Sequence, residues 1–272
     1  MPVAPFKGAR RCRVQVLPTP RFTPLALCVT LTVMQAASID RASPEAPLAP
    51  GLYVVGTPIG NLSDISARAL DTLRSASAIL AEDTRHTRKL LSRYDIHTPL
   101  ISCHKFNEAR RTDPILQQLE NGAALALVSD SGMPGISDPG ARIVAACRDA
   151  RHPVYVVPGP SAVTSAIALS GLGGKGFVFD GFLPHKSGAR RRRLGELLTS
   201  EWPVVLYESP YRAMKLMTEL NDLAPDREIY VGRELTKRFE ESMFGLPGDI
   251  RAAYEGRAIK GEWVVVIAPS SK

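Results

Sequence analysis

Residues 128–140 read VSDSGMPGISDPG and continue the apolar segment ALALV at residues 124–128. That segment has the length and composition of a buried strand in a parallel sheet. Asp138 followed by Pro139 predicts the N-cap and first residue of a helix. The stretch is therefore a turn at the carboxyl end of a strand, where open α/β sheets bind ligands. An ordinary tight turn needs one glycine or asparagine, so three glycines and two prolines favour a ligand-binding loop.

Two more loops of this kind follow short apolar strands. Residues 56–64 (GTPIGNLSD) follow a strand expected at 52–55, and residues 158–161 (PGPS) follow one expected at 154–157. Glycine lets the backbone approach a ligand without a Cβ in the way. None of the loops has the P-loop signature, the dinucleotide-binding GxGxxG or the hydrolase GxSxG. The usual markers of nucleotide-phosphate binding and of serine hydrolases are therefore missing.

Strands and helices alternate along the chain, which predicts an α/β fold. Up to the strand at 154–157 the pattern is that of a mostly parallel sheet with helices on both faces, and from Phe177 the alternation restarts. One of the helices is expected to open at Asp113-Pro114, and Asp83 is expected to cap the helix at 84–94. The glycine-rich residues 171–176 predict a domain boundary. We expect an N-terminal α/β domain at 51–170 and a C-terminal α/β domain at 171–269.

Residues 1–50 differ in composition from the rest. They hold six Lys or Arg against two acidic residues, a net +4 of the total +7, so the overall charge says little about nucleic acid. An apolar run at 25–34 imitates a secretory signal, but prolines crowd it and it is too short to cross a bilayer. We interpret residues 1–50 as a disordered tail or a start assigned too early, with Met34 as the alternative start. The four cysteines lack zinc-ligand and disulfide-framework spacing, which is typical of reduced thiols in a cytoplasmic protein.

Seven motifs follow one another between residues 51 and 269. They are GTPIGNLSDIS (56–66), AEDTRHT (81–87), VSDSGMPGISDPG (128–140), PGPSAV (158–163), GFLP (181–184), YESPYR (207–212) and RELTKRFEE (233–241). Their order resembles that of the ribosomal RNA small subunit methyltransferase I family, in the tetrapyrrole methylase superfamily. The resemblance implies two α/β domains around a cleft for S-adenosylmethionine. It implies methyl transfer to the ribose 2′-hydroxyl of a decoding-centre cytidine in 16S rRNA, by a cytoplasmic homodimer that acts on the small ribosomal subunit without a membrane or a metal.

The resemblance also assigns the site. It places the cofactor against Asp130, Ser131, Gly132, Ile136, Ser161, Ala162, Tyr207 and Glu208. A ribose hydroxyl is a poor nucleophile near neutral pH, so another group must take or orient its proton. The candidates within the motifs are Glu82, Asp83, His104, Lys105, Glu208, Lys237 and Glu241, with Glu208 and Lys237 preferred as the catalytic pair. For any one of them alone, an ion-pair or capping role is the simpler interpretation.

A basic cluster follows GFLP. Its members, predicted to bind RNA, are Lys186, Arg190, Arg191, Arg192 and Arg193. Such a run is usually the solvated start of a helix, and four successive arginines cannot all line one groove. Phe106 and Tyr211 are candidate stacking platforms for bases. Two other functions stay open at this point: a methylase of a corrin or other tetrapyrrole, and a cofactor-binding RNA chaperone without catalysis. GTPIGNL, EDTRHT and the arginines favour the rRNA enzyme over the macrocycle methylase.

Overall fold

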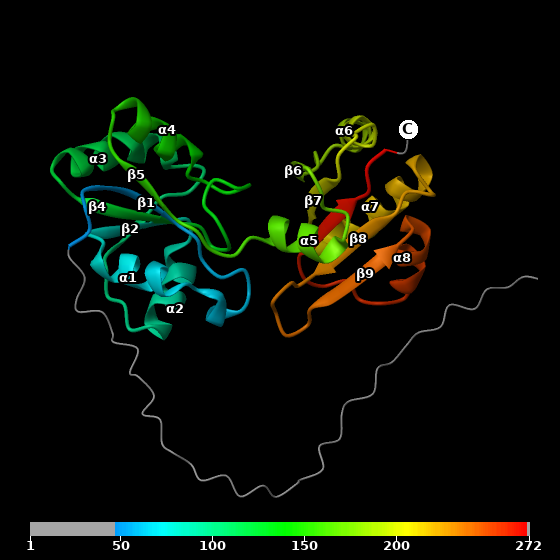
Figure 1. The fold of residues 1–272 in the computed structure, drawn as a ribbon, viewed down its shortest axis with the longest axis horizontal. Coiled ribbons are helices and arrows are strands. Elements are labelled where there is room, and N and C mark those ends of the chain that lie inside the picture. The colour runs from blue at the N-terminus through cyan, green and yellow to red at the C-terminus, as the bar shows by residue number, and fades with distance from the viewer. Residues whose placement is uncertain (1–46, 271–272) are drawn as a thin grey trace, which may run out of the picture. The chain divides into compact units, whose positions relative to one another are not determined.

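The structure, a computed structural model, describes residues 47–270. The tail expected at residues 1–50, with its apolar run at 25–34, lies outside the described residues up to residue 46. The strands of the described part form two five-stranded sheets, as Figure 1 shows. The α/β fold class predicted from the alternation of strands and helices is confirmed.

The first sheet is parallel throughout, with strand order β3-β2-β4-β1-β5. Its elements in chain order are β1 (Gly51–Val55), the 3-10 helix η1 (Leu62–Asp64), α1 (Ala67–Ser75), β2 (Ala78–Ala81), α2 (Thr84–Arg93), β3 (Leu100–Ser102), α3 (Glu108–Glu120), β4 (Ala124–Val128), α4 (Ala141–Asp149) and β5 (Val154–Val157). Parallel strands need a crossover between them, and the helices supply it.

Helices cover both faces of the first sheet because side chains alternate along each strand. Leu52 belongs to the apolar cluster that contains Ile115 of α3 and Ile143 of α4. The next residue, Tyr53, belongs to the opposite cluster, with Leu73 of α1. In Figure 1, α3 and α4 lie above this sheet and α1 and α2 below it. Because the five strands are parallel, their carboxyl ends lie at one edge of the sheet, where the loops predicted to bind a ligand begin.

The second sheet is mixed, with order β6-β7-β10-β8-β9. Its elements are α5 (Ala162–Ser170), β6 (Val178–Phe182), α6 (Ser187–Leu197), β7 (Val204–Glu208), α7 (Pro210–Leu223), β8 (Ile229–Arg233), β9 (Glu241–Gly245), α8 (Pro247–Ala253) and β10 (Trp263–Ile267). Only β6 and β7 pair in parallel. The short connection between β8 and β9 cannot form a parallel crossover, and these two strands pair antiparallel.

The second sheet is also covered on both faces. Residues from α6, α7 and α8 join one buried cluster, which includes Leu194, Met217 and Ile250. Val163 and Ala166 of α5 join the cluster on the other face. Helix α5 thus packs against the second sheet although it precedes the glycine-rich residues 171–176. The domain boundary at residue 170/171 stays a prediction.

Two helix starts differ from the predictions. Helix α3 begins at Glu108, so Pro114 lies inside it and the opening at Asp113-Pro114 is wrong. Helix α4 begins at Ala141 after Gly140, so Asp138 is not its N-cap. For α4 the reason is a tertiary contact: Glu108 Oε1 accepts hydrogen bonds from the Gly140 and Ile143 backbone N–H groups at 3.0 and 3.3 Å. The Glu108 carboxylate caps α4 from another helix, and Asp138 stays in the loop.

Candidate functional site

The three glycine-rich loops meet, as their shared edge of the sheet predicts. Thr57 and Gly132 exchange backbone hydrogen bonds of 2.9 and 3.2 Å, which joins the loop after β1 to the loop after β4. The loop after β5 approaches so closely that a Cβ on Gly56 would come within 2.7 Å of the Gly159 backbone. Only glycine permits this approach. The loops after the neighbouring strands β4, β1 and β5 therefore form one rigid wall.

A cavity of about 320 Å³ lies against this wall. Gly132 has φ of 80°, in the left-handed region, and a Cβ there would meet Ile59 at 3.3 Å and the Pro160 carbonyl at 3.4 Å. The cavity is lined by residues that follow β1, β4 and β5, by residues of β6, β7, β8 and β10, and by residues of the segments that adjoin β7, β8 and β10. These are Ile59, Ser131, Gly132, Met133, Ile136, Ser137, Asp138, Ser161, Ala162, Phe182, Tyr207, Glu208, Ser209, Pro210, Gly232, Glu234, Leu235, Lys237, Glu262, Trp263 and Val264.

Seven of the eight residues predicted to hold a cofactor line this cavity, although they come from three separate motifs. Asp130 is the exception. Its Oδ1 accepts a hydrogen bond from the Asp83 backbone N–H at 3.1 Å, so its carboxylate holds the ends of β4 and β2 together. The role of the seven in binding stays a prediction; what the structure adds is that they share one cavity.

Asp138 is a lining residue that the sequence had assigned to helix capping. Burial raises the pKa of Asp138 to about 6; a hydrogen bond with Ser129 opposes the rise, and the charge of Asp130 reinforces it. Nearby, burial raises the pKa of Tyr207 to about 12, so this phenol stays protonated. Asp138 is therefore a carboxylate near neutral pH, with more proton affinity than an exposed one. Asp138 is part of the glycine-rich motif, but the sequence Asp138-Pro139 predicts the start of a helix and not a residue of the cavity.

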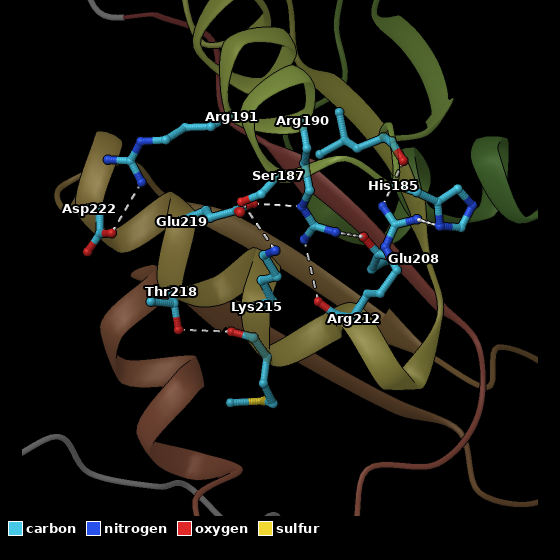
Figure 2. Close-up of polar contacts among 12 residues, drawn as sticks. His185, Ser187, Arg190, Arg191, Glu208, Arg212, Lys215, Thr218, Glu219 and Asp222 are labelled. Atoms are coloured by element: carbon cyan, nitrogen blue, oxygen red, sulfur yellow. Dashed lines mark hydrogen bonds and ion pairs between the residues drawn. The ribbon is translucent and has the colours of Figure 1, made fainter.

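Glu208 lies at the end of β7 and is only 1% exposed. Figure 2 shows its carboxylate between two guanidinium groups. Arg190 Nη1 lies 3.2 Å from Glu208 Oε2, and Arg212 Nε lies 3.2 Å from Oε1, without the alignment of full hydrogen bonds. Oε1 also accepts a hydrogen bond from the Ser209 backbone N–H at 2.8 Å. Glu208 is thus a compensated buried anion that fixes the backbone beside the cavity.

Lys237 is held elsewhere in the same cavity. Its Nζ lies 2.8 Å from Glu234 Oε1 and 2.9 Å from Glu262 Oε2. Burial lowers the pKa of Lys237, but the hydrogen bonds with these two carboxylates outweigh it and raise the pKa above its ordinary value. Lys237 is therefore a protonated ammonium. The predicted pair Glu208 and Lys237 share the cavity, yet each is bound to other partners and they do not form a pair with each other.

The predicted RNA-binding cluster is divided by the fold. Arg190 is 1% exposed and donates to Glu219 Oε2 at 2.6 Å, so the prediction that it contacts RNA is wrong (Figure 2). It lies on the face of α6 that packs on α7. Arg191 is exposed but pairs with Asp222 at 3.3 Å, and Arg193 pairs with Asp180 and Glu196.

Two cluster members remain available to a polyanion. Lys186 and Arg192 are exposed and form no ion pair with the described residues. They lie at the N-cap and in the first turns of α6. Lys215 of α7 is exposed close by, with its Nζ 3.4 Å from Ser187 Oγ. This lysine was not among the predicted residues, since nothing in the sequence brings α7 beside α6.

The remaining proton-transfer candidates lie outside the cavity. Glu82, Asp83, His104 and Lys105 line a second hollow at the ends of β2 and β3. Asp83 caps α2 as predicted, with its side chain accepting from the Arg85 backbone N–H at 2.8 Å. Glu241 binds Arg233 at 2.9 Å and Arg257 at 3.2 Å, which gives it a structural role on β9.

Comparison with known proteins decides the family. Residues 51–250 match the family model described as Tetrapyrrole (Corrin/Porphyrin) Methylases. The ribosomal RNA small subunit methyltransferase I of Thermotoga maritima is 45% identical over 218 residues, which cover 80% of this chain and 97% of that protein. The chain belongs to the ribosomal RNA small subunit methyltransferase I family. The member of this family from Synechocystis is also 45% identical, over 80% of this chain and 78% of its own.

Solved structures confirm the fold expected of this methyltransferase family. A uroporphyrin-III C-methyltransferase from Thermus thermophilus, complexed with S-adenyl homocysteine, matches with a TM-score of 0.55. The match covers 79% of this chain and 96% of that one at 16% identity. At 16% identity, this structural similarity is evidence for the fold alone. Within residues 47–270, no helix is long and apolar enough to cross a membrane.

Proposed function

We propose that this family member transfers a methyl group from S-adenosylmethionine to the ribose 2′-hydroxyl of a decoding-centre cytidine in 16S rRNA. The observation that carries the proposal is the convergence of seven predicted cofactor residues on one cavity. The relatives at 45% identity are named for methyl transfer to small-subunit rRNA. The proposal also rests on the motif order shared with that family.

The cavity fits a cofactor of this kind. Its volume of about 320 Å³ lies within the range of small-molecule sites. Ile59, Ile136 and Leu235 supply apolar walls for an adenosine, and the Gly132 backbone is left bare by its left-handed conformation. Asp138 places a carboxylate in the lining, which suits a cationic sulfonium. When bound, the cofactor supplies an electrophilic methyl group.

The protein's contribution is orientation and control of water. The mutually bonded loops after β1, β4 and β5 hold the lining backbone in place, so binding loses little conformational freedom. Holding two reactants in line supplies about 7 to 11 kcal/mol in favourable cases. Tyr207 packs against Phe179 and Phe182, at ring distances of 5.0 and 5.6 Å, and Tyr207 and Phe182 form an apolar side of the cavity.

Among the carboxylates that line the cavity, Asp138 is the proposed proton acceptor for the ribose hydroxyl. A general base works best when its pKa lies near the working pH, and the pKa of Asp138 is raised to about 6. Glu208 is already bound by two guanidinium groups and a backbone N–H. Lys237 is protonated and so cannot accept a proton. These two residues are proposed to position the cavity walls and to orient the substrate oxygen.

RNA contact is proposed for the exposed cations of α6 and α7, namely Lys186, Arg192 and Lys215. Lys186 and Arg192 follow the cavity residue Phe182 in the chain, and each of the three residues offers one exposed positive charge to a phosphate. A homodimer is proposed as well, because β5 is an edge strand with Val154, Tyr155 and Val156 all exposed. Unpaired apolar edges of this kind favour association.

The proposal is tested by incubating the protein with labelled S-adenosylmethionine and small subunits that lack the modification, followed by nucleoside analysis. The expected product is labelled 2′-O-methylcytidine. Label on a base would refute the reaction, and so would a parallel incubation with a tetrapyrrole that labels the macrocycle while the RNA stays unlabelled. Cofactor binding without any transfer would instead identify the RNA chaperone left open by the sequence.

A further inference from the structure

A second hollow, of about 350 Å³, lies at the carboxyl ends of β2 and β3. We call it the β2–β3 groove. It is lined by Glu82, Asp83, Thr84, Arg85, Ser102, His104, Lys105 and Phe106. The carboxyl edge of a parallel sheet is where α/β folds bind ligands, and this groove occupies the part of that edge beside the cavity described above. Its chemistry differs from that of the cavity, because it combines a large aromatic ring and two exposed cations with the carboxylate of Glu82.

The aromatic ring is Phe106, which is 88% exposed. The turn that carries it is rigid. Phe106 donates its backbone N–H to His104 Nδ1 at 3.2 Å, and buried Asn107 accepts from the His104 backbone N–H at 2.8 Å. The rings of His104 and Phe106 lie 6.1 Å apart in an edge arrangement. A phenylalanine held in water on a fixed turn has an apolar face that nothing in residues 47–270 covers.

The carboxylate of Glu82 forms no hydrogen bond or ion pair with any described residue, whereas its neighbours are satisfied: Asp83 binds Arg85 and Asp130 binds the Asp83 backbone. Burial and then the charges of Asp138, Asp130 and Asp83 raise the pKa of Glu82 to about 7. A half-buried acceptor among like charges is stabilised by a ligand that donates a hydrogen bond to it.

The groove lies beside the cavity: Asp83 of the groove donates its backbone N–H to Asp130 Oδ1 at 3.1 Å, and Ser131, the residue after Asp130, lines the cavity. Asp138 lines the cavity, and it is the strongest charged neighbour of Glu82. A nucleotide with its base in the groove would therefore extend its sugar toward the cavity. Enzymes that modify one nucleotide of a structured nucleic acid commonly extrude it from the stack and hold its base in a pocket.

We propose that the β2–β3 groove holds the target cytosine, with Phe106 stacked on the base and Glu82 accepting a hydrogen bond from its 4-amino group. The inference rests on the proposed function and names the residues that select the base. Cytosine presents an amino donor at this position and uracil presents a carbonyl acceptor, so the ionised form of Glu82 accepts from the first and repels the second. Lys105, exposed at the groove, contacts a flanking phosphate.

The test compares decoding-centre RNA hairpins that carry either cytidine or uridine at the target position. Methyl transfer and RNA affinity, the latter by fluorescence anisotropy, are measured for wild type, Glu82→Gln and Phe106→Ala. An amide both donates and accepts, so Glu82→Gln is expected to reduce the preference for cytidine about tenfold. Phe106→Ala is expected to weaken binding of both RNAs about 5- to 100-fold, the effect of losing one stacked base. Calorimetric affinity for S-adenosylmethionine should stay unchanged in both variants.

Two matched controls remove an exposed group of the same kind from the second sheet and its helices. Phe244→Ala truncates a phenylalanine that is 53% exposed on β9, and Glu255→Gln neutralises an exposed carboxylate after α8. Both should behave as wild type. If Glu82→Gln and Phe106→Ala also match wild type within twofold, the groove assignment is overturned while the methyltransferase stands. If wild type transfers no methyl group, the proposed function fails, and the groove assignment is judged by whether wild type still binds the cytidine hairpin more tightly than Phe106→Ala does.

Discussion

Arg190→Met should destabilise the protein strongly, although a run of four arginines suggests a solvated surface. The guanidinium of Arg190 is 1% exposed, 2.6 Å from Glu219 and 3.2 Å from Glu208. Methionine fills a similar volume but leaves both buried carboxylates short of their partner. Arg212 still neutralises Glu208 at 3.2 Å, so Glu219 is affected more. Removing one partner of a buried pair costs about 3 to 5 kcal/mol, which lowers the Tm of a domain of this size by about 6 to 20 °C.

The assay is urea unfolding followed by far-UV circular dichroism at neutral pH. Arg192→Met, two positions along the same helix, removes an exposed arginine and should stay within about 0.5 kcal/mol of wild type. Adding Glu219→Gln to Arg190→Met should recover part of the stability, because the uncompensated charge disappears. A destabilisation below about 1 kcal/mol for Arg190→Met, well under the range for a buried pair, would refute the interpretation of the network in Figure 2 as a buried charge cluster.

Four further outcomes are expected. Gly132→Val should abolish S-adenosylmethionine binding in calorimetry, because φ is 80° and a side chain would enter the cavity wall. Replacing Lys186 and Arg192 by Ser should make the slope of log affinity for RNA against log salt shallower, by about 1 for each phosphate that is no longer neutralised. Glu82→Gln should flatten the pH dependence of stability between about 4.5 and 7: the folded pKa is raised, so wild type is relatively most stable below 4.5 and becomes less stable as the carboxylate ionises. Val156→Asp on the exposed β5 edge should shift a dimer to monomer in light scattering.

Each of these has a control and a contrary result. Gly174→Val adds a side chain where nothing lies within 4 Å and should bind cofactor normally; equal affinity for Gly132→Val would exclude this cavity as the site. Arg251→Ser, the control for RNA binding, removes an exposed cation of α8. If the variant without Lys186 and Arg192 shows the same salt slope as this control, Lys186 and Arg192 do not contact RNA. For Glu82, parallel stability curves in the variant and wild type would contradict the raised pKa. A wild-type monomer at working concentration would remove the homodimer.

Local sequence patterns were sufficient for the strands, the glycine-rich loops and the Asp83 cap, because each depends on the preferences of neighbouring residues. That the glycine-rich loops meet was predicted in the same way: strand ends of a parallel sheet share an edge, and glycine marks where backbones approach. Thr57, Gly132 and Gly159 met as this rule predicts. The individual cofactor residues came from the family resemblance. Motif order then connected Tyr207 and Glu208 on β7 with those loops, which no periodicity in the sequence does by itself.

Tertiary packing decided the rest. Asp138 was predicted to cap α4, but Glu108 performs that task from α3, and the freed carboxylate lines the cavity. Arg190 was predicted to face RNA, but the helix face that meets α7 carries it into the core. A carboxylate or guanidinium has the same local preferences in either setting. The partner that binds such a group is supplied by residues distant in sequence. The sequence alone therefore identified the charged groups of this protein. Only the packing of its helices determined which of them stabilise the fold and which are available to a ligand.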